Sequence, residues 1–289
     1  MDDASSITQY LFRKIGTTMK NAIALALASL FSLATASASA QATDSNASAH
    51  TAPAAQAAPA AHAPHPVHWS YTGKTDARHW AALDAANSAC KLSREQSPIN
   101  IDTRHLTRAA LAPLEFSYAT GAAEVVNNGH TVQVNLPAGG SLSAGDESTK
   151  LLQFHFHTPS EETINGKHYP MVAHFVHKGD DGMLSVVAVL FKEGHENATL
   201  APVFAALPGQ GQTAALASFD PAALLPANHA YYKFTGSLTT PPCSDGVHWQ
   251  VLKTPVELSK QQIAAFRKLY PMNARPVQKL NGRHVLVSR

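Results

Sequence analysis

The stretch "LLQFHFH", Leu151 to His157, places two histidines one residue apart in an alternating apolar run. Side chains on a β-strand alternate between faces, so His155 and His157 share a face with Gln153, while the two phenylalanines share the other. The pattern therefore predicts a strand that points two imidazole rings in one direction. That face of the strand must meet something that requires two nitrogen ligands.

Other short runs also have strand character, because they are rich in Val, Phe, Tyr and Thr and are bounded by Gly, Pro, Asn or Asp. These runs are "AEVVNN", "TVQVNL", "MVAHFVHK", "LSVVAVLFKEG", "YYKFTGSL" and "HWQVLKTPVEL". The clearest helical signal is residues 259–270, with Ser259 as N-cap, Ile263, Phe266 and Leu269 at helical spacing, and Pro271 after it. The prediction is a mostly β domain of the α+β class, with short surface helices.

The first 40 residues resemble an N-terminal extension followed by a secretory signal peptide. From Met19 the chain carries a lysine, an apolar run, and Ala38-Ser39-Ala40 as a small-residue cleavage site before Gln41. A membrane anchor is the alternative, but the apolar run has only about a dozen residues and a span needs roughly 20. Residues 1–18 contain two aspartates and do not suit a signal n-region, so Met19 is a candidate start.

Residues 41–66 are dominated by alanine and proline and contain no Leu, Ile, Val or aromatic side chain. Such a segment has nothing to bury and predicts a flexible linker, whose histidines at 50, 62 and 65 either stay solvated or bind metal loosely. Residues 67–289 then form one domain of roughly 220 residues. A net charge of +2 without a Lys/Arg cluster argues against a nucleic-acid partner.

Cys90 and Cys243 are the only two cysteines, and both follow the signal segment. In an oxidising compartment an even pair predicts a disulfide, whereas two buried free thiols are the alternative. Closing a loop of this length would stabilise the fold by about 5 kcal/mol in the chain-entropy model.

A third histidine lies on the next predicted strand. An Asn-Gly turn at residues 165–166 precedes "MVAHFVHK", which contains His174. If this strand pairs antiparallel with the first, three imidazoles face one cavity, and three protein ligands with an open position define a catalytic zinc site. A half-exposed strand with alternating His and Phe remains the alternative at this point.

Five motifs together resemble the α-class carbonic anhydrases, in family order and with family-like spacing. They are "QSPINI", "VVNNGHTVQV", "QFHFHTPSEE", "AHFVHK" and "GSLTTPPCSDGVHW". The resemblance runs from His68-Trp69 to about residues 273–276, and the signal and cysteine pair are similar to the bacterial secreted or periplasmic branch. It implies a single domain built on a large central, mainly antiparallel twisted sheet.

The resemblance implies that His155, His157 and His174 bind Zn²⁺ and that the chain hydrates carbon dioxide reversibly to bicarbonate and a proton. In carbonic anhydrases, the standard example of this effect, zinc brings the pKa of its water to about 7, so hydroxide can attack at neutral pH. The implied partners are carbon dioxide and bicarbonate. No stable membrane span is expected after signal cleavage, and a homodimer is possible.

Three further residues take catalytic roles by resemblance. Thr239 would orient the nucleophile and donate its own hydroxyl proton to Glu161, and His130 would shuttle the released proton to buffer. Without the resemblance, Glu161 would be an ordinary loop carboxylate and His130 an ordinary turn residue.

The remaining residues of the implied site surround the metal ligands. The resemblance implies that Gln153 and the backbone of Asn273 hold the first and second histidines, and it implies an apolar substrate wall. That wall comprises Val176, Val186, Leu238 and Trp249, which would otherwise be core residues, and Thr240 is a further substrate-binding residue beside it. One position departs from the family, because Val172 stands where a glutamate usually holds the third histidine. The sequence therefore predicts that His174 lacks its carboxylate partner.

Two other functions fit parts of the sequence. A carbonic-anhydrase-like binding module that has lost catalysis is one, although such relatives typically lose a metal histidine. A periplasmic zinc buffer is the other, suggested by 16 histidines, but storage has no use for Thr239, Glu161 and His130.

Overall fold

The structure is a computed structural model that describes residues 68–288. The predicted signal peptide, the start at Met19 and the 41–66 linker lie outside the described residues, and so does Arg289. Within residues 68–288, no helix is long and apolar enough to cross a membrane.

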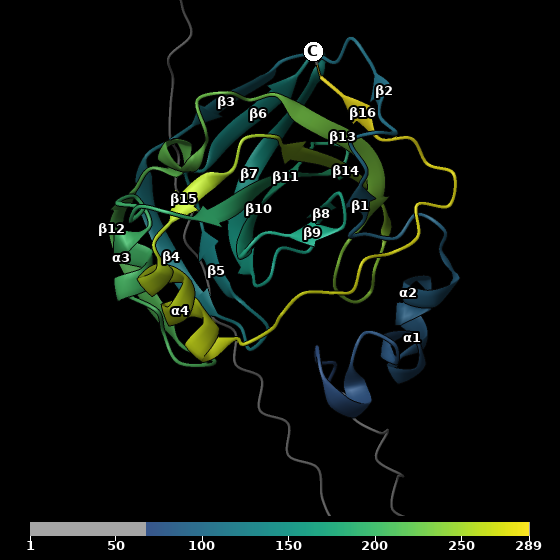
Figure 1. Cartoon of the computed structure of the whole chain (residues 1–289). Helices are drawn as coiled ribbons and strands as arrows, with labels where there is room; N and C mark the ends of the chain where they lie inside the picture. The colour runs from purple at the N-terminus through teal and green to yellow at the C-terminus, as the bar shows by residue number, and fades with distance from the viewer. Residues whose placement is uncertain (1–67, 289) are drawn as a thin grey trace, which may run out of the picture. The chain divides into compact units, whose positions relative to one another are not determined.

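Thirteen strands form one large twisted sheet (Figure 1). They are β2 (Thr107–Arg108), β3 (Leu114–Tyr118), β4 (Gly121–Asn127), β5 (Val132–Asn135), β6 (Gly140–Ala144), β7 (Glu147–His157), β10 (Met171–Lys178), β11 (Leu184–Glu193), β12 (Thr213–Phe219), β13 (Tyr231–Ser237), β14 (Asp245–Leu252), β15 (Val256–Leu258) and β16 (Leu286–Val287). The main path runs β12-β4-β5-β7-β10-β11-β14-β13-β16-β2, while β15 pairs with β11 and β6 joins β3 to β7. All the predicted strand runs are confirmed, and "HWQVLKTPVEL" divides into β14 and β15.

Most neighbouring strands in this sheet are antiparallel, as predicted. The parallel pairs are β11 with β14, β11 with β15, and β16 with β2. A small separate sheet contains β1 (Asn100–Ile101), β8 (Thr163–Ile164) and β9 (Lys167–His168). The predicted Asn-Gly turn joins β8 to β9, and Asn165 and Gly166 have φ of 53° and 76°, as a type I′ hairpin turn requires.

The helices are short. They are α1 (Trp80–Leu83), α2 (Ala89–Leu92), α3 (Ala201–Ala205) and α4 (Lys260–Leu269), with 3₁₀ turns at Gly73–Thr75, Ala85–Asn87 and Pro221–Leu224. α4 begins after the predicted N-cap Ser259, whose side chain accepts from the backbone N–H of Gln262 in a capping box. Ile263 and Phe266 are buried, whereas Leu269, at the end of the predicted apolar face, is 37% exposed.

Side-chain alternation on the central strands separates two apolar clusters. On β7, Phe154 and Phe156 enter the larger cluster, which also contains Phe266 of α4. The opposite face of the sheet carries the histidines, beside a second cluster that includes Val186 and Trp249. The alternation in "LLQFHFH" therefore packs one face of β7 into a core and leaves the other for a site.

Candidate metal centre and active site

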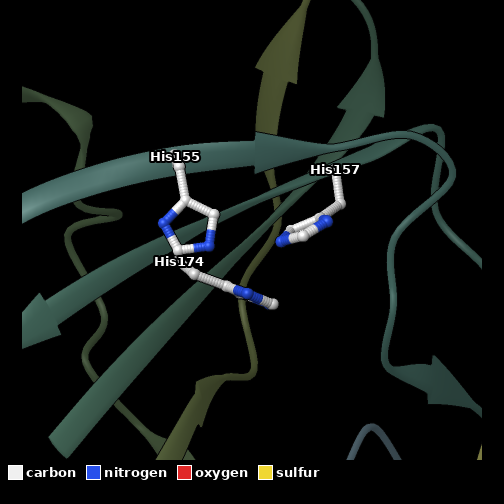
Figure 2. A group of neighbouring side chains, drawn as sticks. All are labelled: His155, His157 and His174. Atoms are coloured by element: carbon white, nitrogen blue, oxygen red, sulfur yellow. The ribbon is translucent and has the colours of Figure 1, made fainter. Parts of the chain in front are cut away.

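Three imidazole rings converge from two neighbouring strands (Figure 2). β7 and β10 pair antiparallel, and their register sets His174 directly opposite His155. His157 lies two residues further along β7, on the same face. One ring nitrogen of each histidine lies within 4.8 Å of the others. The cluster confirms the predicted spatial grouping of the three histidines.

Each ring uses its other nitrogen to donate a hydrogen bond, which fixes the orientation of the ring. The first two acceptors are the ones predicted from the sequence. The bonds run from His155 Nδ1 to Gln153 Oε1 (2.9 Å), from His157 Nδ1 to the Asn273 carbonyl (2.7 Å), and from His174 Nε2 to Glu162 Oε2 (3.2 Å). These bonds leave His155 Nε2, His157 Nε2 and His174 Nδ1 with free lone pairs.

The donor set fits a zinc ion. His157 Nε2 is buried and has no hydrogen-bond partner among the described residues, which is costly unless something else occupies its lone pair. Burial lowers the pKa of His155 to about 3 and that of His157 well below its ordinary value, so both rings are neutral at pH 7. Neutral imidazole is the form that binds metal, and three histidine side chains with an open side match a catalytic zinc site.

The prediction for His174 is wrong in one respect. Val172 is buried and can accept no hydrogen bond, yet the outward nitrogen of His174 does meet a carboxylate, that of Glu162. Burial alone would lower the pKa of His174, but the nearby Glu162 and Glu161 carboxylates raise it above its ordinary value. Glu162 was missed because it reads as a second loop acid in "SEE", twelve residues away from the histidine.

Glu161 lies on the side of the cluster where the free nitrogens point. Its Oε1 accepts from the backbone N–H of Arg275 at 2.7 Å, and its Oε2 lies 3.6 Å from His157 Nε2 and 3.9 Å from His174 Nδ1. Burial raises the pKa of Glu161 to about 7, against the lowering effects of His174 and the neighbouring Thr239 hydroxyl. The structure thus brings Glu161 and Thr239 together beside the three histidines.

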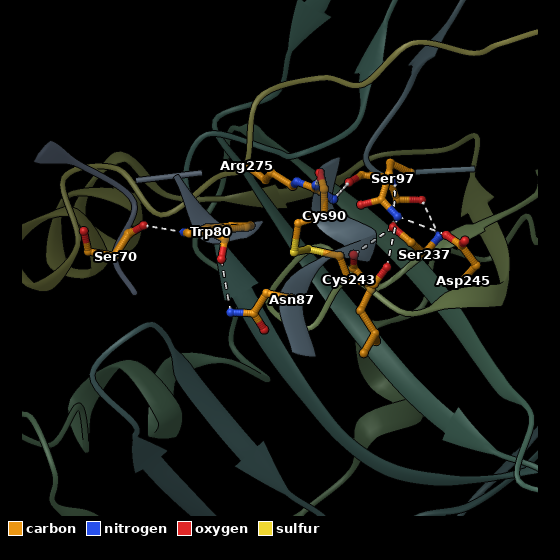
Figure 3. The surroundings of a disulfide bond; sticks show 11 residues. Ser70, Trp80, Asn87, Cys90, Ser97, Ser237, Cys243, Asp245 and Arg275 are labelled. Carbon is orange, nitrogen blue, oxygen red and sulfur yellow. Dashed lines mark hydrogen bonds between the residues drawn. A yellow bond between two sulfur atoms is a disulfide. The ribbon is translucent and has the colours of Figure 1, made fainter. Parts of the chain in front are cut away.

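Thr239 belongs to the loop between β13 and β14, which a disulfide anchors. Cys243 is bonded to Cys90, 153 residues away, as predicted (Figure 3). The N–H of Cys243 donates to the Thr240 carbonyl at 2.9 Å. Gln96 Nε2 also donates to the Cys243 carbonyl at 2.9 Å. The loop that carries Thr239 is therefore tied to a segment distant in sequence.

Arg275 connects this loop region to Glu161, a role the sequence did not reveal. Its side chain is 1% exposed and donates to the carbonyls of Ser97 (2.7 Å) and Cys90 (3.1 Å). The guanidinium also lies over the Trp80 ring, 5.5 Å from its centroid (Figure 3). Burial lowers the pKa of Arg275 to about 10, so it remains charged at neutral pH.

The predicted apolar wall lies beside the metal cluster. Val186 and Trp249 are buried in the second cluster, and Val176 and Leu238 pack against it. The Trp249 ring meets the His174 ring edge-on, with centroids 4.9 Å apart. Thr240 is half-buried in the loop next to Thr239.

His130 lies against the aromatic segment that opens the described chain. Its ring stacks on Trp69, with centroids 3.6 Å apart and planes 7° apart, and His68 meets its edge at 4.7 Å. Burial, with a smaller contribution from His68, lowers the pKa of His130 to about 4.

Known proteins match this chain over about three quarters of its length, 76% for the first of them. The sequence profile of the eukaryotic-type carbonic anhydrases matches residues 75–289. A carbonic anhydrase of Pectobacterium carotovorum is 44% identical over 223 residues, which are 76% of this chain and 91% of that protein.

Solved structures give the same result. The α-carbonic anhydrase of Thermovibrio ammonificans, in complex with the inhibitor sulfanilamide, is 47% identical with a TM-score of 0.74 and covers 76% of this chain and 98% of its own. The Photobacterium profundum α-carbonic anhydrase is 45% identical with a TM-score of 0.72 and covers 76% and 100%. With the profile spanning well over half of its length, the chain belongs to the eukaryotic-type, or α-class, carbonic anhydrase family.

Proposed function

We propose that the chain catalyses the reversible hydration of carbon dioxide to bicarbonate and a proton with zinc held by His155, His157 and His174. The observation that carries this proposal is the set of three convergent ring nitrogens, each left free because its partner nitrogen is hydrogen-bonded. When bound there, zinc would supply the positive charge that activates water at neutral pH.

Thr239 and Glu161 would orient the attacking water. Glu161 has one oxygen occupied by the Arg275 N–H, which leaves the other to accept the proton of the Thr239 hydroxyl. The hydroxyl oxygen of Thr239 would then accept a hydrogen bond from the water. This bond would direct a lone pair of the water oxygen toward carbon dioxide. A ligand without a proton to donate to Thr239 would be disfavoured.

Carbon dioxide would be held against the apolar wall of Val176, Val186, Leu238 and Trp249, with Thr240 at its edge. The substrate carries no charge, so an apolar surface holds it without the desolvation cost that a polar surface would impose. Contact between Trp249 and the His174 ring keeps this wall adjacent to the metal ligands.

His130 would carry the released proton to buffer. Stacked on Trp69, with a pKa of about 4, it is too weak a base for this task at pH 7, so the ring would leave the stack to work. Rotation toward water would return its pKa toward about 6.5.

The predicted signal segment and the disulfide support a secreted or periplasmic location, with residues 41–66 as a linker to the 67–289 domain. A homodimer is compatible with these features.

Stopped-flow hydration of carbon dioxide tests the proposed function. The purified chain should contain one zinc per molecule, lose activity when a chelator removes the zinc, and regain it when zinc is restored. Sulfanilamide, the inhibitor bound to the Thermovibrio enzyme, should inhibit the restored protein. Hydration that persists in a chain stripped of zinc would refute the proposal.

A further inference from the structure

We propose that Glu162 is the positioning residue for His174, and that it replaces from a loop the glutamate that the family usually carries at position 172. Given the zinc role proposed above, Glu162 would fix the His174 tautomer and slow the release of the metal. Glu162 Oε2 lies 3.2 Å from His174 Nε2, and both side chains are essentially inaccessible to solvent.

Two consecutive glutamates lie at opposite nitrogens of one imidazole ring. Glu161 Oε2 is 3.9 Å from His174 Nδ1, the nitrogen left free for metal, whereas Glu162 meets Nε2. A carboxylate at Nε2 keeps the proton on that nitrogen and leaves the lone pair on Nδ1. The two acids therefore have different roles, although they are neighbours in an ordinary-looking loop sequence.

Glu162 has little else to hold it in a buried place. Its side chain is 0% exposed, its Oε1 has no hydrogen-bond partner among residues 68–288, and its Oε2 meets only His174. A buried carboxylate with one partner is costly unless a nearby positive charge offsets it. A divalent cation on the other side of the same ring supplies that charge, which ties the retention of Glu162 to the metal centre.

Val172 explains why the carboxylate must come from the loop. It lies two residues before His174 on β10 and so shares its face of the sheet, where it is fully buried within the second apolar cluster. His174 Nε2 has one proton to donate. Carboxylates at both 162 and 172 would compete for this proton in a site without water. A glutamate at either position alone should therefore favour zinc retention, whereas glutamates at both positions should not improve it.

Four proteins test this prediction: the natural full-length chain, Glu162→Ala, Val172→Glu, and the double variant Glu162→Ala/Val172→Glu. The measurement is the rate at which each zinc-loaded protein loses zinc to an excess of chelator. Glu162→Ala should release zinc about 10 to 100-fold faster than the natural chain, as expected when such a partner is lost. The double variant should return to within a few-fold of the natural chain, and Val172→Glu alone should hold zinc no longer than it.

Glu162→Gln and Thr163→Val serve as matched variants. Glutamine keeps the size and an acceptor oxygen but not the charge, so its release rate should fall between those of the natural chain and Glu162→Ala. Thr163 is the adjacent buried residue, and its hydroxyl donates to Asn100 Oδ1 rather than to a metal ligand. Thr163→Val should leave the zinc release rate unchanged. That result would show that the faster release from Glu162→Ala does not come from a general loosening of this segment.

The tautomer of His174 gives a second readout on the zinc-free protein. At a pH above the raised pKa of His174, two-bond ¹H–¹⁵N spectra should show the proton on Nε2 in the natural chain and a mixture of tautomers in Glu162→Ala. Equal zinc release from the natural chain and Glu162→Ala, or a Val172→Glu chain that holds zinc longer, overturns the role of Glu162 while leaving the zinc centre intact. A natural chain that binds no zinc would instead overturn the proposed function.

Discussion

At the scale of single residues, the stacked position of His130 in the structure differs from the solvated position that its proposed role as a proton shuttle needs. The ring stacks on Trp69, and burial, with a smaller contribution from His68, lowers the pKa of His130 to about 4. The backbone N–H of His130 donates to Asn128 Oδ1 at 3.0 Å, a bond that does not involve the ring. The shuttle role therefore requires an exchange between stacked and solvated rings.

Replacing His130 by alanine should lower the maximal hydration rate in weakly buffered solution by on the order of 100-fold, the lower range for general acid–base catalysis. The second-order rate constant for carbon dioxide should change far less, because proton removal follows the chemical step. Stopped-flow rates with and without added imidazole provide the measurement, and imidazole should restore much of the loss. Equal losses in both parameters would show that His130 shapes the site instead.

The resemblance to the carbonic anhydrases predicted the acceptors of His155 and His157, since Gln153 and Asn273 occupy family positions. The acceptor of His174 could not be found in this way. Nothing in "SEE" distinguishes a buried acid from a solvated one, and only the folded loop brings Glu162 to Nε2. Arg275 was missed for the same reason, because its burial depends on Trp80 and two backbone carbonyls far away in sequence.

At the scale of elements, strands with long runs of large apolar residues, alternating or continuous, were predictable, and strands without such runs were not. β7, β10 and β11 combine Val, Phe and Leu with clear boundaries. β12, "TAALASF", is an alanine-rich strand at the sheet edge with mostly exposed or half-buried side chains, and β3 and β6 are comparably weak. α1, α2 and α3 have four or five residues each, too few to show helical periodicity.

The disulfide between α2 and the β13–β14 loop should contribute strongly to stability. The bond joins two residues that are 153 positions apart in the sequence. Without it the unfolded chain gains much conformational freedom, which favours unfolding. Cys90→Ser/Cys243→Ser should lower the free energy of unfolding by about 2–5 kcal/mol. Urea denaturation of both proteins measures this difference. A loss below about 1 kcal/mol would mean that the surrounding contacts of Arg275 and Gln96 hold the loop without the bond.

At the scale of the whole molecule, buried neutral histidines make the zinc-free fold sensitive to acid. His177 is fully buried, donates from Nδ1 to the Ser185 carbonyl (3.3 Å) and accepts from the Tyr118 hydroxyl at Nε2 (2.7 Å). Burial lowers its pKa from 6.5 to about 4. The pKa of His177 is lower in the folded protein than in the unfolded chain, so acid protonates the unfolded chain first. The contribution of neutral His177 to the free energy of unfolding is therefore complete above pH 6.5 and is lost as the pH falls toward 4.

Zinc-free natural chain should therefore lose about 3 kcal/mol more stability between pH 7 and pH 4 than zinc-free His177→Gln, whose side chain does not titrate. Urea denaturation of both proteins across this range isolates the contribution, since the other histidines are common to both. Parallel stability curves would show that His177 does not control the acid sensitivity.

The sheet as a whole was predictable from the motifs, and its role in the site follows from register. Antiparallel pairing of β7 with β10 brings His174 opposite His155 across about 20 residues of intervening chain. β14 pairs parallel with β11 and places Trp249 beside Val186. The three proposed metal ligands therefore all come from the central sheet.

Zinc content and hydration rate, measured together on His157→Ala, test the central claim most directly. His157 is buried, its Nδ1 is held by the Asn273 carbonyl, and its Nε2 has no partner other than the proposed metal among the described residues. Two imidazoles cannot complete a tetrahedral catalytic site, so the variant should lose both zinc and hydration activity while a matched natural sample keeps both. One zinc per chain with near-normal hydration in His157→Ala would contradict the account.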